Sequence, residues 1–295
     1  MFTVGTDAEF FLKDASNEFV SAIPYIKNGK HSPKVLPSGG NVTHDNVALE
    51  FATPVANDEN EFIEVVGKTM RESITDLPKG IVLDTSASVD FPKSELDHEE
   101  ARVFGCDPDF DAWELIINEV PFEACDGQFR SVGGHLHIGH VEGVGNDFLL
   151  EPMGKVFTVK ALDVMLGIPM TIMDNNNASI ARRDLYGKAG CHRPTNYGVE
   201  YRSMSNFWLF SPKLVQVVHK LADDALASIR NGSAIKLVEK IGEKEIQRVI
   251  NQGDKEAAKN LWSDLISKEV SKDSKKIFTA LSRRKRFNIY KEWSL

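Results

Sequence analysis

The stretch FTVGTDAEFFL, residues 2–12, decides the fold that we expect for this chain. It alternates and is rich in Phe, Thr and Val, a pattern that is typical of a β-strand. Side chains two residues apart on a strand point to the same face of a sheet, so Asp7 and Glu9 share one face. The other face carries the apolar side chains of Ala8, Phe10 and Leu12. A strand of this kind predicts a sheet whose apolar side is covered by helices.

Three later segments show the same division: VALEF at 47–51, GGHLHIG at 133–139 and GVEYRS at 198–203. In each of them, ionisable side chains alternate with apolar ones. The ionisable side chains are those of Glu50, His135, His137, Glu200 and Arg202. If all four strands belong to one sheet, one of its faces is a cleft lined with ionisable groups. The glycines beside the histidine pair allow a backbone or a ligand to approach closely.

The remaining pattern predicts an α+β protein with a mostly antiparallel sheet and helices on one face. Strands are expected at 81–89 and 198–210, and the polar, Arg-rich residues 175–198 suggest a functional loop. The expected helices are 59–77, a short one near Ala112–Asn118, 153–167 (with Pro169 ending it), and a series from Ser211 to about Val270. We expect residues 1–210 to form a catalytic domain and residues 211–295 a helical section packed on it or extending it.

The composition excludes some classes of protein. With 42% hydrophobic and 26% charged residues, the chain is typical of a globular protein, and we expect no run of about 18 apolar residues that would cross a bilayer. The net charge of −8 disfavours a dedicated nucleic-acid binder, and the basic run SRRKR at 282–286 is interpreted as a solvated helix face. Three cysteines without a CxxC pair and a start without a basic leader favour a cytoplasmic protein.

The clustered ionisable groups indicate a chemistry. Three or four carboxylates with an imidazole suit Mg²⁺ or Mn²⁺, which prefer oxygen ligands, better than they suit structural zinc. Arginines add bidentate contacts to phosphate or to a substrate carboxylate. Carboxylates for divalent ions together with arginines for phosphoryl oxygens are the components of phosphoryl transfer. Each segment alone also has a plainer explanation: a solvated sheet face, hydrogen-bonded structural histidines or an ordinary in-strand ion pair.

Together these residues resemble a known family. GTDAEFFL, DNVALEFATP, GGHLHIGH and RRDLYGKAGCHRPTNYGVEYRSMSNFW are similar to segments of the phage-type carboxylate–amine ligases, as is FGCDPDFDAW at 104–113. These amidoligases are related to glutamine synthetase and glutamate–cysteine ligase, and the likeness covers roughly residues 3–210. It implies the half-barrel sheet of that superfamily. It also implies an ATP-dependent reaction that phosphorylates a carboxylate and then joins it to an amine.

The resemblance assigns roles residue by residue. It implies metal ligands at Asp7, Glu9, Glu50, His135 and Glu200. It places His137 near the nucleotide phosphates, and Arg202 on the transferred phosphoryl group or the acyl substrate. Arg182, Arg183 and Arg193 would handle phosphate and substrate carboxylate, with catalytic roles for Arg183 and Arg193 beside Arg202. Two positions depart from the family pattern: Asp7 replaces a Glu, and Gly198 stands where the longer RxExR motif has its first Arg.

Other interpretations remain open. The same ions could serve a metal-dependent phosphotransferase or hydrolase that forms no amide, or the fold could persist in a catalytically silent phage structural or regulatory protein. The base that takes a proton from the amine is also open among Asp45, Asp174 and Asp184. We expect small-molecule or peptide substrates, and no nucleic-acid or membrane partner.

Overall fold

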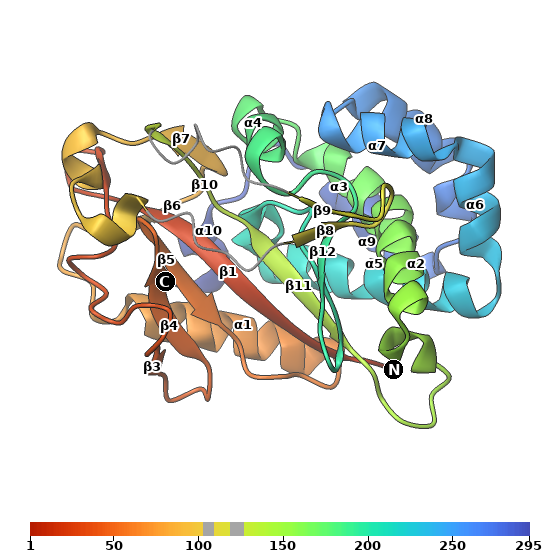
Figure 1. The fold of residues 1–295 in the computed structure, drawn as a ribbon, viewed down its shortest axis with the longest axis horizontal. Helices are drawn as coiled ribbons and strands as arrows, with labels where there is room; N and C mark the ends of the chain where they lie inside the picture. Colours follow the sequence, from red (N-terminus) through yellow and green to blue (C-terminus); the bar gives the residue numbers. More distant parts are fainter. Residues whose placement is uncertain (103–108, 119–126) are drawn as a thin grey trace.

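A computed structural model of the chain describes residues 1–102, 109–118 and 127–295. In this part, a long antiparallel sheet forms the centre, and β1 (Thr3–Lys13) and β11 (Gly134–Gly139) lie side by side in its middle (Figure 1). The strand order is β3–β4–β5–β1–β11–β13–β12–β8–β9, and β2 and β6 also pair with β1. The prediction of an α+β protein with a mostly antiparallel sheet is therefore confirmed.

The other strands of this sheet are short. They are β2 (Phe19–Val20), β3 (Lys34–Val35), β4 (Asn41–Asp45), β5 (Ala48–Ala52), β6 (Val82–Asp84), β8 (Asp109–Asp111), β9 (Ile116–Asn118), β12 (Cys191–Pro194) and β13 (Gly198–Tyr201). A separate two-stranded sheet pairs β7 (Ser88–Asp90) with β10 (Phe129–Ser131). The predicted strand at 81–89 is thus divided between two sheets, because Asp84 accepts a hydrogen bond from the backbone of Ser86 and turns the chain.

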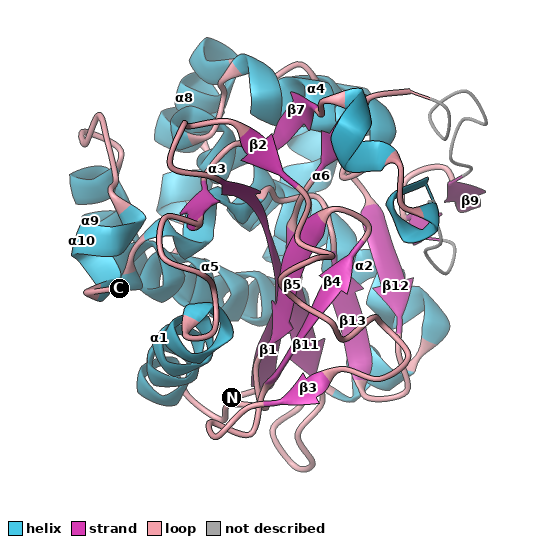
Figure 2. Cartoon of the chain, turned by 90° about the vertical axis from the view of Figure 1, so that its left-hand side faces the viewer, coloured by secondary structure: helices cyan, strands magenta, loops and turns pink. Residues whose placement is uncertain are grey.

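Helices cover the apolar face of the sheet. α1 (Glu59–Ile74) and α5 (Pro212–Arg230) lie behind it in Figure 1 and to its left in Figure 2. Ser211 caps α5 by accepting a hydrogen bond from the Leu214 amide, as the Ser–Pro pair predicts. The remaining helices are α2 (Pro152–Leu162), α3 (Ile168–Met173), α4 (Asn177–Leu185), α6 (Ser233–Ile241), α7 (Glu243–Asn251), α8 (Lys255–Asp264), α9 (Lys272–Leu281) and α10 (Ile289–Trp293).

Alternate side chains of β1 enter different clusters. Phe10 belongs to the main core beneath the sheet, with side chains of α1 and α5. Phe11, on the same face as Asp7 and Glu9, enters a smaller apolar cluster with Phe91 and Val132. On this face of β1, the ionisable side chains therefore end at Glu9, and the buried apolar side chain of Phe11 follows them.

The helical segment 152–173 differs from one of our predictions. Pro169 does not end it, because a π-helical turn, Asp163–Gly167, joins α2 to α3 and the Ile168 amide donates to the Asp163 carbonyl five residues back. By length and composition this segment could cross a membrane, against our expectation that no stretch is long enough. However, 78% of the apolar stretch within this segment is buried inside the protein, as in the core helix of a globular protein.

Four other segments differ from expectation. The basic run 282–286 lies between α9 and α10 and is not the face of a helix. Residues 112–118 form a turn and β9 rather than a helix, because the Asp111 carboxylate accepts hydrogen bonds from the Trp113 and Glu114 amides. The expected loop at 175–198 contains α4 and β12, and the side chain of Asn176 caps α4. The expected strand at 198–210 ends at Tyr201, and Ser205 then caps a 3₁₀ helix, Asn206–Phe210.

Candidate functional site

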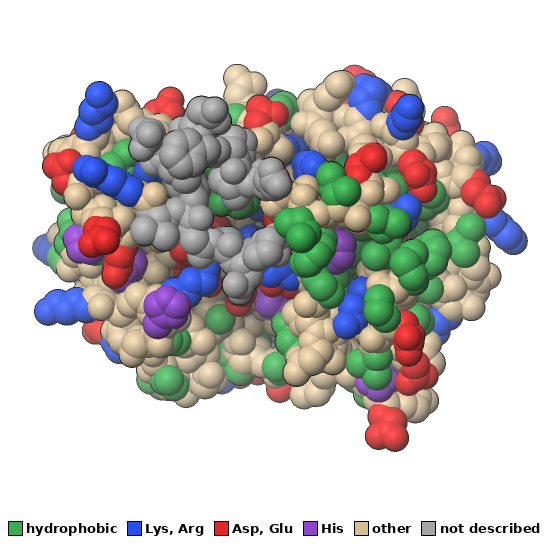
Figure 3. Space-filling view, in the orientation of Figure 1, with side chains coloured by type: hydrophobic (Ala, Val, Ile, Leu, Met, Phe, Trp, Pro, Cys, Tyr) green, Lys and Arg blue, Asp and Glu red, His purple; other side chains and the backbone are tan. Residues whose placement is uncertain are grey.

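The pairing of the strands brings the predicted ionisable residues onto one face. Asp7 of β1 lies opposite His135 of β11, and Glu9 lies opposite Glu50 of β5. His137 lies opposite Glu200 of β13. Charged and histidine side chains gather near the middle of the face that Figure 3 presents. Residues far apart in the sequence therefore meet on neighbouring strands.

Asp7, His137 and Glu200 form the first ligand-like group. Each offers one oxygen or nitrogen atom, and these atoms lie within 4.8 Å of one another. The Asp7 carboxylate is 3.0 Å from His137 Nε2. Burial opposes the charge on the imidazole, but the charge and hydrogen bond of Asp7 outweigh it and raise the pKa of His137. Burial likewise opposes the charge on Asp7, and His137 more than compensates, so the pKa of Asp7 is lowered.

Glu9, Asp45 and Glu50 form the second group, again with ligand atoms within 4.8 Å of one another. Burial and the charge of Asp45 raise the pKa of Glu9 to about 7. Burial, together with the charge of Glu9, raises the pKa of Glu50 well above its ordinary value. Lys30 partly offsets this negative charge, with its Nζ 3.2 Å from Asp45 Oδ2. Such mutual repulsion is relieved when a cation binds.

His135 and Arg202 are buried between these groups. Arg202 Nη1 donates to Glu200 Oε1 and to His135 Nδ1, the latter at 3.0 Å. The imidazole therefore carries its proton on Nε2. Burial and the charges of Arg202 and Arg182 hold the pKa of His135 well below its usual range, so the ring is neutral. Asp109 of β8 adds a second carboxylate 3.6 Å from Arg202 Nε.

The other predicted arginines lie in different surroundings. Arg182 is buried, and its guanidinium donates to the carbonyl oxygens of Val132, Arg202 and Ser203, so it ties α4 to the strands. Arg183 points away from the cleft, donates to the Asp174 carbonyl and lines a separate cavity beside Trp208. The geometry thus gives no support to a catalytic role for Arg183.

Arg193 of β12 approaches the site from the side. Its Nη1 lies 3.6 Å from Glu200 Oε1. At Gly198, where the family motif has an arginine, an added Cβ would lie 2.1 Å from the Ile138 carbonyl oxygen. A larger residue at 198 therefore has no room, and Arg193 is the arginine that reaches Glu200 from this side.

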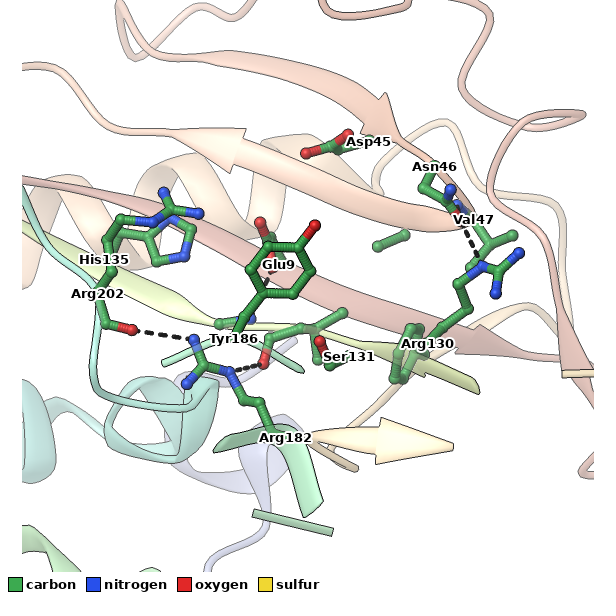
Figure 4. Close-up of a pocket in the computed structure, with 14 residues that line it drawn as sticks. Glu9, Asp45, Asn46, Val47, Arg130, Ser131, His135, Arg182, Tyr186 and Arg202 are labelled. Carbon is green, nitrogen blue, oxygen red and sulfur yellow. Dashed lines mark hydrogen bonds between the residues drawn. The ribbon is translucent and has the colours of Figure 1, made fainter. Parts of the chain in front are cut away.

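A cavity of about 60 Å³ adjoins the second group. In Figure 4, Glu9 and Tyr186 lie at its centre, between the His135–Arg202 pair and the Asn46–Arg130 pair. Arg130 donates to Asn46 Oδ1 and to the carbonyl oxygens of Gly127, Phe129 and Ala101. A larger space of about 340 Å³ lies beside the first group, between the start of β1, Thr53, His137 and Tyr197.

Asp45 and Tyr197 are two of the site residues that lie outside our predicted ligand set. Asp45, considered only as a possible base, completes the second group, because Asn46 adopts a positive φ of 54° and turns β4 tightly into β5. Of the three candidate bases it is the one that lines the cavity: Asp174 is bound by Ser179 and Ser205, and Asp184 is exposed elsewhere. Tyr197 is the second residue; it lies in the family-like segment that ends in YGVEYRSMSNFW, but the resemblance assigned it no role.

The Tyr197 hydroxyl lies 2.5 Å from His137 Nδ1. We expect Tyr197→Phe to lower the affinity for Mn²⁺ about tenfold, because a hydrogen bond on one ring nitrogen orients the other nitrogen toward a metal. Calorimetric titration of Mn²⁺ measures this change. Tyr290→Phe is the matched control, since its hydroxyl accepts from the Leu83 amide far from the site. Equal affinities in both variants would contradict the role of Tyr197.

Comparison with known proteins gives one family. The sequence model described as phage phiEco32-like COOH.NH2 ligase-type 2 matches residues 119–288, more than half of the chain. The matched region contains His135, His137, Glu200 and Arg202, begins after Asp7, Glu9 and Glu50, and extends further toward the C-terminus than the likeness that we expected. No curated protein sequence matches the chain.

One similar solved structure is a bifunctional glutathione synthetase from Pasteurella multocida. It shares 10% sequence identity, with a TM-score of 0.46. The alignment covers 95% of this chain and 51% of that chain, so this chain spans about half the length of that protein.

Proposed function

Because the chain belongs to the phage phiEco32-like COOH.NH2 ligase-type 2 family, we propose that it uses ATP and Mg²⁺ to join a carboxylate to an amine through an acyl phosphate. One observation carries this proposal beyond the family: two ligand-like groups and a buried His–Arg pair share one face of the sheet. Acidic groups suit divalent ions, and the pair offers hydrogen-bond donors to an anion.

The donor sets fit divalent ions. Asp7, His137 and Glu200 would hold one, and Glu9, Asp45 and Glu50 a second, in agreement with the oxygen-rich preference of Mg²⁺ or Mn²⁺. When bound, such ions neutralise charge on phosphate oxygens. The family resemblance gives His135 a metal role. However, its Nδ1 accepts a hydrogen bond from Arg202 and its Nε2 carries the proton, so neither nitrogen can bind a metal until that bond is broken. We therefore assign the metal role to His137 and an anion-binding role to His135.

The proposed reaction has two steps. A carboxylate oxygen of the substrate attacks the γ-phosphorus of ATP, and ADP leaves. The amine nitrogen then attacks the acyl carbon of the acyl phosphate, inorganic phosphate leaves and the amine loses a proton. Asp45 is the candidate base that lies in the cleft.

The residues of the chain orient and stabilise these groups. Arg202 and the Nε2 proton of His135 donate to the transferred phosphoryl group, where negative charge develops. Arg182 holds the Arg202 backbone in place. Arg193 adds positive charge beside Glu200. Fixed donors of this kind lower the barrier because they need no reorganisation during the reaction.

The two spaces suggest how the substrates are distributed. We place the nucleotide in the larger space beside His137 and Tyr197, and the reacting carboxylate in the smaller cavity beside Glu9. A cavity of about 60 Å³ accommodates a small head group, so a longer substrate would extend outward past Tyr186.

We also propose a superfamily, a division into domains and a cellular compartment for this protein. The antiparallel sheet with an ionisable face is compatible with the half-barrel of the glutamine synthetase superfamily. Residues 1–210 would form the catalytic domain, with the helices from Pro212 onward packed on it. We further propose that the protein acts in the cytoplasm, that of the host if a phage encodes it.

The test uses hydroxylamine as the amine, because it traps acyl phosphates as hydroxamates. The full-length protein is incubated with ATP, Mg²⁺, hydroxylamine and each of the common amino acids and dicarboxylic acids in turn. We expect ADP, phosphate and hydroxamate to form together for at least one carboxylate. ATP turnover that is equally fast without carboxylate and amine would instead support a hydrolase on the same fold. Absence of both reactions with all of these acids would contradict the proposal.

A further inference from the structure

One carboxyl group beneath the sheet is connected to β13, the strand that carries Glu200 and is followed directly by Arg202. Asp163 lies at the start of the π-helical turn Asp163–Gly167, where its side chain is completely buried. It belongs to the helical layer under the apolar face, on the side opposite the cleft. A buried carboxyl group is costly unless hydrogen bonds satisfy its oxygens.

Asp163 accepts hydrogen bonds from a residue of β13 and from residues beside the strands, including the Gly190 backbone just before β12. The Tyr201 hydroxyl of β13 donates to Oδ1 at 2.7 Å. The Trp113 indole N–H, from the turn between β8 and β9, donates to Oδ2 at 2.7 Å. Ser203, just after β13, adds a longer contact of 3.4 Å. These donors are neutral, and burial raises the pKa of Asp163 to about 7, which agrees with a costly position.

The connection to the cleft follows from strand alternation. Tyr201 stands between Glu200 and Arg202, so its side chain points down to Asp163 while theirs point up into the cleft. Trp113 follows β8, whose Asp109 lies 3.6 Å from Arg202 Nε. The same carboxyl group is therefore bonded to Tyr201 of β13 and to Trp113 just after β8, and these two strands carry Glu200 and Asp109, two of the groups that contact the Arg202 guanidinium.

The fit around Tyr201 is tight on the helix side. A Cβ added at Gly167 would lie 2.8 Å from the Tyr201 hydroxyl. The π-helical turn thus presents both a hydrogen-bond acceptor and a space without a side chain to the same phenol. The helical layer thus fixes the position of the Tyr201 side chain relative to the sheet. Because Tyr201 stands between Glu200 and Arg202 in the chain, its position also constrains theirs.

We propose that Asp163 is a positioning residue for the active site: by bonding Tyr201 and Trp113 it sets the placement of Glu200, Arg202 and Asp109. The inference rests on the proposed function for its catalytic consequence, but its effect on Glu200 is independent of any reaction. A residue that serves only folding would affect stability and leave the site unchanged.

The main variant is Asp163→Asn. Its amide oxygen can still accept from Tyr201, whereas its NH₂ group faces the Trp113 N–H, so one bond is replaced by a donor–donor contact. We expect Mn²⁺ affinity at the Asp7–His137–Glu200 group to fall about tenfold, and kcat to fall about tenfold with an unchanged KM for ATP. Tyr201→Phe should give a similar loss, and the double variant should show less than the product of the two effects.

Thr171→Val is the matched control, because it removes a buried hydrogen bond of the same helical segment that reaches only the Gly167 carbonyl. It should lower Tm and leave Mn²⁺ affinity unchanged. If Asp163→Asn does not fold, Trp113→Phe removes one of the two bonds and is measured in the same way. A lower Tm with wild-type Mn²⁺ affinity in the folded variants would overturn the proposal. Wild-type protein that binds Mn²⁺ but makes no amide would overturn the proposed function alone.

Discussion

We expect Glu200→Gln to lower the proposed ATP-dependent amide formation by about 10²–10³-fold and to weaken Mn²⁺ binding in the same variant. The reason is that one carboxylate serves two roles. It belongs to the ligand group with Asp7 and His137, and it accepts from Arg202 Nη1. The neutral amide keeps the shape but removes the charge. Steady-state kinetics by hydroxamate formation and calorimetric titration of Mn²⁺ measure the two losses separately.

The matched control is Glu245→Gln, which removes the charge from a Glu–Arg pair on the surface of α7, where Glu245 Oε2 lies 2.7 Å from Arg248 Nε. We expect no measurable change in turnover. Arg202→Ala completes the comparison: it should retain Mn²⁺ binding and lose the chemical step, because the guanidinium donates to the phosphoryl group and is not a ligand. Wild-type turnover in Glu200→Gln would refute the site assignment.

We expect the Tm of the metal-free protein to fall as the pH rises from about 5 to 8, and added Mn²⁺ to reverse most of this loss at the higher pH. Glu9 has a pKa of about 7, and that of Glu50 is raised well above its ordinary value. Folding therefore favours their protonated forms. Their contribution to stability is complete below the unfolded pKa of about 4 and is lost as the pH rises through about 7.

The expected loss is about 1–3 kcal/mol in the free energy of unfolding, or several degrees in Tm. Divalent ions bind the ionised carboxylates, so the shift in Tm on adding Mn²⁺ should be larger at pH 8 than at pH 5.5. Glu50→Gln should raise the metal-free Tm at pH 8 and reduce the Mn²⁺ shift. Glu256→Gln, on an exposed Glu–Lys pair, is the control. A Mn²⁺ shift that is independent of pH would rule out the proposed coupling.

The sequence alone predicted which side chains share one face of the sheet, because alternation along a strand depends only on the residues of that strand. Asp7 and Glu9 lie on one side of β1 whatever the partner strand is, and the same holds for the pair Glu200 and Arg202. The choice between His135 and His137 was different. Both point to the same face, and the registers that pair His135 with Asp7 and His137 with Glu200 set which groups surround each imidazole. Such pairing between distant segments leaves no local signal.

The arginine-rich segment illustrates a second limit. If this segment were a loop, the side chains of Arg182 and Arg183 could point in the same direction. In α4, consecutive residues are about 100° apart around the helix axis, so Arg182 faces the strands and Arg183 faces away. The expected loop was wrong because the Asn176 cap was overlooked. The division of the chain at residue 210 stays a prediction.

The central place of β1 has a consequence for how the protein is made. Its neighbour β5 follows within 50 residues, but its other long partner, β11, comes from residues 134–139. During synthesis, β1 has one unpaired edge until that segment has left the ribosome, and Glu200 arrives later still. Contacts of such long sequence separation slow folding and leave a strand edge open to association with other chains. An ion at the Asp7–His137–Glu200 group can therefore bind only after β11 and β13 have paired with β1, whereas the Glu9–Asp45–Glu50 group needs only β1, β4 and β5.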